Sequence, residues 1–220
     1  DGVPITKKVF EVNWDAEAAE RGGFEHFMMK EIHEQPEALQ KTFAPRRSRQ
    51  PGTYDWLPIS RAEAQQLRKI SIVACGTAYH AGLLGKYAIE RLARLPVEVE
   101  IASEYRYRDP IIGEDELFIA VSQSGETADT LAALREARRR GARVMAVCNV
   151  VGSTIAREAG DENTLYTYAG PEIAVASTKA YMPQAEMMLM LAIALGDLRG
   201  QLSRQQADEL LDGLAALPAL

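Results

Sequence analysis

The stretch from Leu117 to Ala137, LFIAVSQSGETADTLAALREA, decides the fold of this chain. Its first five residues form an apolar run with the length of a buried strand, and its second half repeats at helical spacing. Between them the letters SQSGET hold three hydroxyls, an amide and a glycine, with no lysine or arginine. The stretch therefore predicts a strand that passes through a polar turn directly into a helix.

The same alternation continues on both sides of this stretch. Short β-branched runs alternate with helical segments from Ile70 onward. This alternation predicts an α/β fold with a parallel sheet that is covered by helices on both faces. We expect strands at residues 70–75, 97–102, 117–122, 143–148 and 164–169. We expect helices at residues 79–94, 127–140, 153–158, 177–195 and 203–217, and a short helical turn near Glu104.

The region before the first strand has a different character. Residues 1–22 are typical of a linker or extended arm, and residues 44–58 of a loop. Between these two segments, residues 24–43 predict an amphipathic helix that Pro36 should kink or divide. Pro183 should interrupt or bend the long helix near the end of the chain in the same way. The apolar residues that recur at helical spacing in the first helix are Phe24, Phe27, Met28, Ile32 and Leu39.

Helix ends carry their own signals. Ser60 with Glu63, and Ser203 with Gln206, have the spacing of a capping box, in which the first side chain and the fourth bond each other's backbone amides. Gly141 has the position of the glycine that commonly follows a helix. These signals predict two helix starts and one helix end.

Composition excludes several classes of function. The 220 residues hold 25 Lys+Arg against 31 Asp+Glu, a formal net charge of −6, so we expect no nucleic-acid partner. The apolar segment 187–195 is shorter than the roughly 20 residues that span a bilayer, and no signal peptide is visible. We expect a soluble cytoplasmic protein without a membrane partner. Because the chain opens on Asp1, we also expect it to be a piece of a longer protein.

Three junctions of the predicted sheet are polar where a ligand would bind. Ligands of open α/β sheets bind outside the carboxyl ends of the strands. Cys75–Thr77 follows the first expected strand, Ser122–Thr127 follows the third, and Val175–Thr178 precedes the long helix. These junctions are therefore the candidate binding loops.

The middle junction suits a phosphate group. Gly125 permits a tight turn, and the helix that begins near Thr127 has unpaired amides and a positive dipole end. The hydroxyls of Ser122, Ser124 and Thr127 can each donate a hydrogen bond to a phosphate oxygen. Together they predict a phosphate site without a fixed cationic side chain, as a sugar phosphate would need.

Two neighbouring residues and one alternative explanation bear on the predicted phosphate site. Gln123 offers donors and an acceptor to sugar hydroxyls, and the carboxylate of Glu126 should point away from a phosphate. Serines at the start of a helix are, however, most often simple caps, so a purely structural role stays open. The chain lacks both G-x-G-x-x-G and G-x-x-x-x-G-K-[ST], which disfavours dinucleotides and nucleoside triphosphates.

SQSGETADTL resembles the phosphosugar-binding signature of SIS (sugar isomerase) domains. Together with five further segments it resembles the isomerase domain of glutamine–fructose-6-phosphate aminotransferases (isomerizing), also called glucosamine-6-phosphate synthases. The resemblance covers about residues 22–196. The further segments are GGFEHFMMKEIHEQPEAL, CGTAYHAG, EIASEYRYRDP, VCNVVGSTIARE and EIAVASTKAY.

The resemblance implies a fold and a division of the chain. It implies a flavodoxin-like α/β/α sandwich around a five-stranded parallel sheet of order 2-1-3-4-5. It also implies that this chain is the first of two SIS subdomains, with a second subdomain and a glutaminase domain as partners in a homodimer. The division expected is an arm at 1–22, a helical extension at 23–69, the SIS domain at 70–200 and a final helix at 201–220.

The resemblance also implies an activity and a set of contacts. Family enzymes convert fructose 6-phosphate and glutamine into glucosamine 6-phosphate and glutamate, for amino-sugar synthesis. Their catalytic lysine, glutamate, histidine and N-terminal cysteine fall on none of these residues, so we expect binding and not turnover, without a cofactor or metal. Ala78 departs from members that have a serine there. The implied sugar-phosphate contacts are Thr77, Ser122, Gln123, Ser124, Thr127, Val175 and Ser177.

A lysine and three histidines could have a catalytic, metal-binding or ligand-binding role, but each also has a simpler structural explanation. Lys179 could form a Schiff base, but an ion pair or a place at the pocket rim is the preferred interpretation. His26 and His33 lie on one helical face without a convincing set of further metal ligands, so we expect packing or partner contacts. His80 has either a place near the ligand or a place at the surface.

The two cysteines and a run of three arginines also have ordinary structural explanations. Cys75 and Cys148 should be about 9.5 Å apart, at two strand spacings, which exceeds the reach of about 7 Å that a disulfide has. We therefore expect two free, buried thiols. The residues 138–140 are all arginine and should be a solvated helix end.

Two alternatives to an aminotransferase domain remain open from the residues alone. One is a non-catalytic SIS module that senses phosphosugars, and the other is a stand-alone phosphosugar isomerase. The segment FEHFMMKEIHEQP favours the aminotransferase interpretation, because it resembles the entry to that family's isomerase domain.

Overall fold

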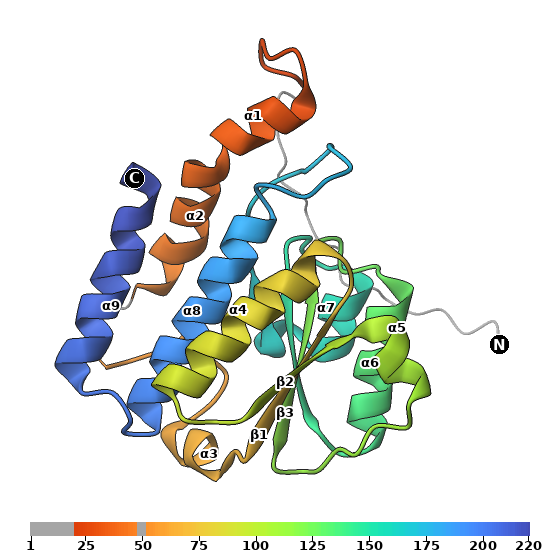
Figure 1. Cartoon of the computed structure of the whole chain (residues 1–220), viewed down its shortest axis with the longest axis vertical. Helices are drawn as coiled ribbons and strands as arrows, with labels where there is room; N and C mark the ends of the chain where they lie inside the picture. Colours follow the sequence, from red (N-terminus) through yellow and green to blue (C-terminus); the bar gives the residue numbers. More distant parts are fainter. Residues whose placement is uncertain (1–19, 48–51) are drawn as a thin grey trace, which may run out of the picture.

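The structure is a computed structural model that describes residues 20–47 and 52–220. The predicted arm at residues 1–22 lies almost entirely outside the described residues, as do residues 48–51 of the predicted loop. In Figure 1 a twisted sheet stands at the centre, with helices on both sides and further helices beyond α8.

The sheet has five parallel strands in the order β2-β1-β3-β4-β5, as expected. Ala74 pairs with Val121 and Ser122 pairs with Cys148, so neighbouring strands end at the same level. The last strand is shorter than predicted, because it ends at Tyr166 and not at residue 169. The strands are β1 (Lys69–Ala74), β2 (Val97–Ile101), β3 (Glu116–Ser122), β4 (Arg143–Cys148) and β5 (Thr164–Tyr166).

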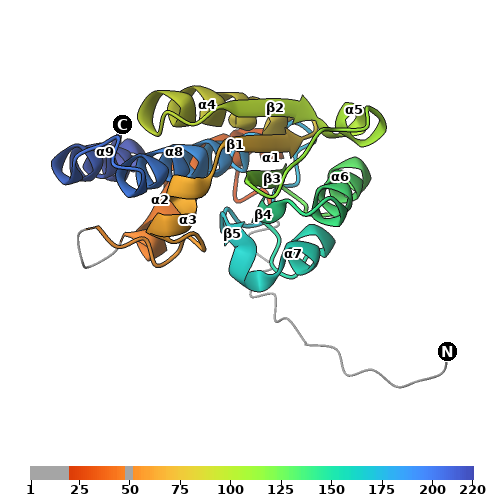
Figure 2. The same ribbon diagram turned by 90° about the horizontal axis from the view of Figure 1, so that it is seen from below.

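Alternate residues of each strand face opposite helical layers. Ile72 and Ile119 belong to a core shared with α4 (Thr77–Leu92) and α8 (Tyr181–Leu198). Phe118 belongs to a second core on the other face of the sheet, which the three helices of the second layer cover. Figure 2 shows the two layers on either side of the sheet, which confirms the three-layer sandwich. The helices of the second layer are α5 (Ala102–Tyr107), α6 (Ala128–Arg139) and α7 (Thr154–Ala159).

Helix α8 is apolar on all sides because it is covered on all sides. It packs against α4 and the sheet, and its outer face contacts α2 (Gln35–Phe43) and α9 (Arg204–Ala216). Pro183 does not interrupt it, contrary to the prediction. The helix begins at Tyr181, so the proline lies in the first turn, where its missing amide costs no hydrogen bond. None of the helices within residues 20–47 and 52–220 is long and apolar enough to cross a membrane.

The first helical region is divided near Pro36, as predicted. Helix α1 (Phe27–His33) ends just before Glu34, and Pro36 stands in the first turn of α2. The expected apolar face is, however, wrong for α1: Met28 and Ile32 are each 41% exposed, whereas Glu31 is 2% exposed. The buried side of α1 is therefore charged.

The predicted helix ends are confirmed. Capping boxes start α3 (Arg61–Gln66) at Ser60 and α9 at Ser203. Gly141 takes a positive φ after α6 and donates to the carbonyl of Arg138, while Ala142 donates to that of Ala137. The short 3₁₀ turns are η2 (Ala44–Arg46), η3 (Asp161–Asn163) and η4 (Leu217–Ala219).

Candidate functional site

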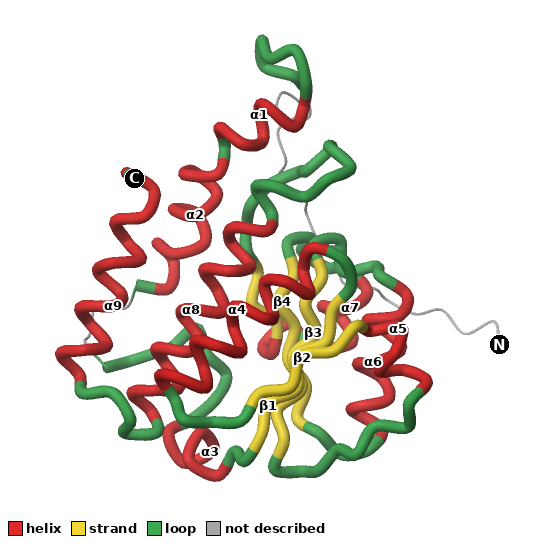
Figure 3. The backbone as a smooth tube through the Cα atoms, viewed as in Figure 1, coloured by secondary structure: helices red, strands yellow, loops and turns green. Residues whose placement is uncertain are grey.

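The three polar junctions lie at the carboxyl end of the sheet. The first and second follow β1 and β3, which are neighbours, and the third is the long loop between β5 and α8. Figure 3 shows these loops gathered at one end of the strands, with the loop before α8 beside the start of α4. The topology thus brings together segments that are up to a hundred residues apart in the sequence.

The loop Ser122–Thr127 is held by its own hydroxyl groups. The Oγ of Ser122 accepts a hydrogen bond from the amide of Gly125 at 3.0 Å and lies 3.0 Å from Oγ1 of Thr127. The Oγ of Ser124 accepts from the amide of Glu126 at 3.2 Å. Ser122 is buried, so it organises the loop, whereas Ser124 and Thr127 are partly exposed and keep hydroxyl donors for a ligand.

The start of α6 has no side-chain cap among the described residues. Thr127 is the N-cap residue, but its hydroxyl faces Ser122 and does not bond an amide of the first turn. A threonine in this position ordinarily caps its helix. The first amides of α6 therefore lie at the positive end of the helix dipole without a cap, and the acid of the first turn, Asp129, pairs with Arg106 at 3.1 Å.

Glu126 points away from this helix start, as predicted. Its Oε1 accepts a hydrogen bond from the amide of Thr154 at 2.7 Å, at the start of α7. Hydrogen bonds from the side chain and the backbone of Thr154 lower the pKa of Glu126. The acidic residue of the loop thus serves the neighbouring helix and leaves α6 without a negative charge from this side chain.

Gly125 is required by both its conformation and its surroundings. Its φ is +66°, and a Cβ atom there would stand 2.5 Å from Cβ of Ser153 and 1.9 Å from its hydroxyl oxygen. Its carbonyl accepts from the amide of Ile155 at 2.9 Å. The loop after β3 is therefore pressed against the start of α7.

The junction after β1 presents Thr77 to solvent. Gly76 has a φ of +58° and turns the chain sharply, so that Thr77 is the first residue of α4 and is exposed. Ala78 is buried in the core beneath α4, so its position faces the interior of the protein. His80 is exposed and contacts the ring of Tyr79 edge-on.

The loop before α8 presents Val175 and Ser177 in different ways. Val175 is fully exposed, whereas the hydroxyl of half-buried Ser177 donates to Glu172 at 2.9 Å. The second oxygen of Glu172 accepts from the amides of Thr178 at 2.8 Å and Ala180 at 3.1 Å. The carboxylate of Glu172 thus bonds the amides of the last loop residues before α8.

Two more acidic residues hold this loop from the outside. Glu31 of α1 accepts from the amides of Ile173 and Ala174, and Glu34 forms an ion pair with buried Lys179 at 2.5 Å. The preferred interpretation of Lys179, an ion pair, is therefore confirmed. The sequence does not single out Glu31, Glu34 and Glu172, because no spacing links these acids to the loop groups that they bond.

The remaining candidate residues have ordinary surroundings. The ring of His33 stacks on Phe24, and His26 lies 3.7 Å from Glu25. No cluster of three or more possible metal ligands occurs in the described part of the chain. The three arginines at the end of α6 bond nearby acidic side chains or, for Arg138, also the carbonyl of Glu158.

Both cysteines are free thiols, as predicted, but only one is buried. Burial raises the pKa of Cys148 to about 12, so this thiol stays protonated. Cys75 is only half-buried, and its sulfur lies 3.9 Å from the hydroxyl of Thr130. The prediction of two buried thiols is wrong for Cys75, because it stands beyond the end of β1.

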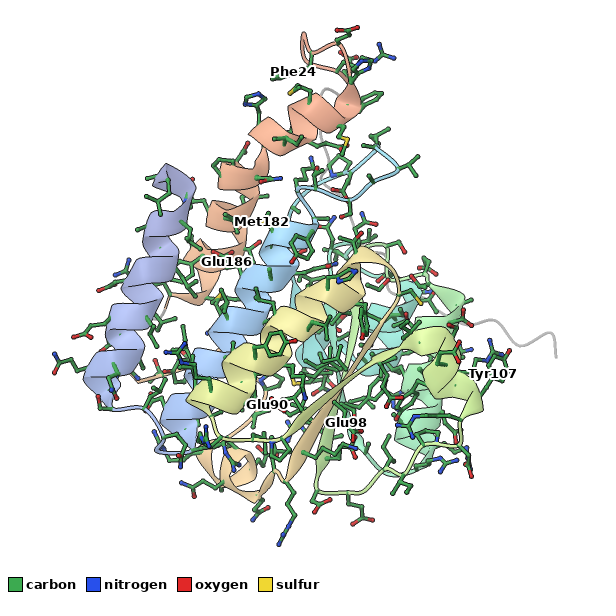
Figure 4. The ribbon with its side chains drawn as sticks, in the orientation of Figure 1. Phe24, Glu90, Glu98, Tyr107, Met182 and Glu186 are labelled. Carbon is green, nitrogen blue, oxygen red and sulfur yellow. The ribbon has the colours of Figure 1, made fainter. Side chains whose placement is uncertain are left out.

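A separate groove of about 690 Å³ runs along the edge strand β2. Its charged side chains are already paired, for example Lys69 with Glu98 at 2.7 Å and Arg108 with Glu100. Figure 4 shows Glu98 on this strand, away from the carboxyl-end loops. The groove is wide but its charges are satisfied, so the loops remain the better candidate site.

A comparison with known protein families agrees with this geometry. The SIS domain family matches residues 65–194, which hold β1 to β5 and the three junctions. The chain belongs to the SIS domain family. The family match confirms the resemblance that SQSGETADTL carries.

Named relatives narrow the comparison. A glutamine–fructose-6-phosphate aminotransferase [isomerizing] from Symbiobacterium thermophilum is 58% identical over 219 residues, 99% of this chain. One from Thermus thermophilus is 49% identical over 220 residues, 100% of this chain. The chain spans only 36% of the length of each of these relatives.

Solved structures agree with the fold. The C-terminal domain of glucosamine-fructose-6-phosphate aminotransferase from Francisella tularensis is 38% identical with a TM-score of 0.83, covering 91% of this SIS chain and 56% of that one. A glucosamine-6-phosphate deaminase from Thermotoga maritima is 21% identical with a TM-score of 0.63, covering 88% of this chain and 54% of that one, and supports the fold alone.

Proposed function

We propose that the carboxyl end of this sheet binds a hexose 6-phosphate, with fructose 6-phosphate and glucosamine 6-phosphate as its ligands. The observation that carries the proposal is the start of α6, whose first amides have no side-chain cap and whose first-turn acid, Asp129, is engaged by Arg106 at 3.1 Å. A helix start of this kind binds phosphate well. The names of the relatives support the choice of sugar.

The residues would divide the ligand between two subsites. Ser124, Thr127 and the first amides of α6 would hold the phosphate, while buried Ser122 keeps their loop in shape. Thr77, Gln123, Val175 and Ser177 would face the sugar. Ser177 supports this role less directly than the exposed residues, because its hydroxyl already donates to Glu172.

We further propose that the chain works as the first SIS subdomain of a glutamine–fructose-6-phosphate aminotransferase (isomerizing). The reaction of that enzyme, its second SIS subdomain, its glutaminase domain, a homodimer and a cytoplasmic location are parts of this proposal. The domain limits predicted above, at residues 23, 70 and 201, belong to it too. The share of 36% that the chain covers in its relatives supports the presence of further domains in such an enzyme.

Calorimetry with fructose 6-phosphate and with fructose tests the binding proposal. The protein should bind the phosphate ester and should bind fructose far more weakly, since a charged hydrogen-bonded group contributes about 1.5–3 kcal/mol per bond. Equal affinity for the two sugars would contradict the proposal. The protein, given glutamine and fructose 6-phosphate, should form no glucosamine 6-phosphate without the remaining catalytic domains.

A further inference from the structure

The loop before α8 is exposed at its tip and has no regular secondary structure. Between Gly170 and Ala180 the chain forms only bends and turns, and Val175 at the tip is fully exposed. Because such a segment loses much conformational entropy when it is fixed, it binds a ligand well only if something holds it beforehand. The loop therefore needs anchors outside its own sequence.

Glu31 is the first of these anchors. It lies on α1, some 140 residues away in the sequence, and only 2% of it is exposed. Its Oε1 accepts from the amides of Ile173 at 2.6 Å and Ala174 at 3.1 Å. Burying a carboxylate is costly unless it accepts hydrogen bonds, so these two bonds offset part of that cost, while Oε2 has no hydrogen-bond partner among the described residues.

Glu34 is the second anchor. Its Oε2 lies 2.5 Å from Nζ of Lys179, whose side chain is almost fully buried. Lys30 also approaches Glu34, at 3.5 Å from the other carboxylate oxygen. Breaking a buried ion pair by removing one partner is strongly unfavourable, so Glu34 fixes the backbone two residues after Ser177.

The two anchors enclose Val175 and Ser177, two of the four residues that were predicted to face the sugar. Glu31 holds the chain just before Val175, and Glu34 holds it just after Ser177. Both anchors come from the helical extension and bond the loop before α8. The phosphate subsite, in contrast, is shaped by bonds among its own residues.

We propose that Glu31 and Glu34 are positioning residues of the sugar subsite, and that the α1–α2 extension holds the loop 172–178 in its binding conformation. The inference rests on the proposed function. It also explains why α1 buries Glu31 and exposes Met28 and Ile32, since the face turned to the loop must accept hydrogen bonds. The extension would thus set the affinity for the sugar without altering the affinity for phosphate.

The test measures two ligands on one set of variants. Calorimetry with fructose 6-phosphate and with inorganic phosphate is carried out on the wild type, Glu31→Ala, Glu31→Gln and Glu34→Gln. The matched control is Glu37→Ala, which removes an exposed acid from α2 that pairs with Lys41. Thermal unfolding of each variant establishes that binding is measured well below the unfolding midpoint.

We expect Glu31→Ala and Glu34→Gln to bind fructose 6-phosphate about tenfold more weakly, and inorganic phosphate within about twofold of the wild type. Glu31→Gln should recover most of the loss because it keeps an acceptor oxygen, and Glu37→Ala should match the wild type. An unchanged affinity for fructose 6-phosphate in Glu31→Ala would overturn the positioning role. A wild type that binds neither ligand would instead overturn the proposed function.

Hydrogen exchange keeps the inference testable if Glu31→Ala does not fold. The amides of Ile173 and Ala174 should exchange slowly in the wild type, since both are bonded to a buried carboxylate. Exchange at the rate of an unstructured peptide would overturn the inference without any variant.

Discussion

Helices α6 and α8 begin at the same end of the sheet but differ in what their first amides meet. Before α8, the carboxylate of Glu172 accepts from the amides of Thr178 and Ala180. At α6, Thr127 stands in the capping position and caps nothing. Both helix starts are electropositive and neither N-cap side chain caps its helix, but a protein carboxylate bonds the amides at the entry to α8, whereas the entry to α6 is open to an external anion.

A third helix start sharpens the contrast. Helix α7 receives the carboxylate of Glu126, which comes from the same loop that leaves α6 uncapped. Glu126 is close to the start of α6 in the sequence, but its carboxylate bonds the start of α7. The difference teaches that where the neighbouring carboxylates point indicates an open helix start better than the presence of serines does.

Gly125→Ala should give the largest effect. The alanine would need a positive φ and would collide with Ser153, which costs about 2–5 kcal/mol of unfolding free energy and deforms the phosphate loop. Chemical denaturation measures the loss, and calorimetry should detect no binding of fructose 6-phosphate. Gly213→Ala is the control, because that glycine lies within α9 with open space around it and should gain about 0.5–1 kcal/mol. A stable Gly125→Ala that binds normally would break the comparison.

Thr127→Asp should convert the start of α6 into one that resembles the start of α8. The new carboxylate would stabilise the helix by about 0.5–1 kcal/mol and repel a phosphate, weakening fructose 6-phosphate binding by about 3 kcal/mol. Thermal unfolding and calorimetry measure the two opposite changes. Thr127→Asn caps without charge and should weaken binding less. If the aspartate lowered stability, or left binding intact, α6 and α8 would not differ as described.

Glu186→Gln should produce a smaller effect that extends the comparison along α8. Glu186 lies between α8 and α2 (Figure 4), and neither of its oxygens has a hydrogen-bond partner among the described residues, unlike Glu172. Burial raises the pKa of Glu186 to about 8 from 4.5, against the opposing effect of Arg46.

The sign of the pH dependence follows from this shift. Between pH 4.5 and 8 the folded state keeps a proton that the unfolded chain has lost, so stability falls as pH rises through this window. Urea unfolding measures the free energy of unfolding of the wild type and of Glu186→Gln at pH 5.5 and pH 8.5. Between these two pH values, the difference in free energy of unfolding between variant and wild type should shift in favour of the variant by about 1–2 kcal/mol. A wild type whose stability does not fall over this range would mean that Glu186 has a partner after all.

Local signals explain how much of the fold could be predicted. The strand order followed from the family resemblance, and the capping boxes at Ser60 and Ser203 followed from residues three apart. Pro183 was misread because α8 begins four residues later than its pattern suggests. The later start comes from Glu172, which bonds the amides of Thr178 and Ala180 before the helix. No local rule reveals hydrogen bonds across six or eight residues of an irregular loop.

The candidate site divides in the same way. The hydroxyl bonds of the loop after β3 were predictable because they join six adjacent residues, whereas the partner of Glu126, the amide of Thr154, is 28 residues away. Glu31 was not predictable, because the helical spacing of Met28 and Ile32 favoured these apolar residues as the buried ones. Tertiary contacts with the loop 172–178 reversed that preference.

A titration of the backbone amides by nuclear magnetic resonance tests the central claim most directly. Inorganic phosphate and fructose 6-phosphate should shift the amide signals of Ser124 and of residues 128–130, at the open start of α6. The amides of Thr154 and Thr178, which already bond Glu126 and Glu172, should shift little. Shifts that concentrate at α7 or α8, or a titration that leaves the start of α6 unchanged, would contradict the account.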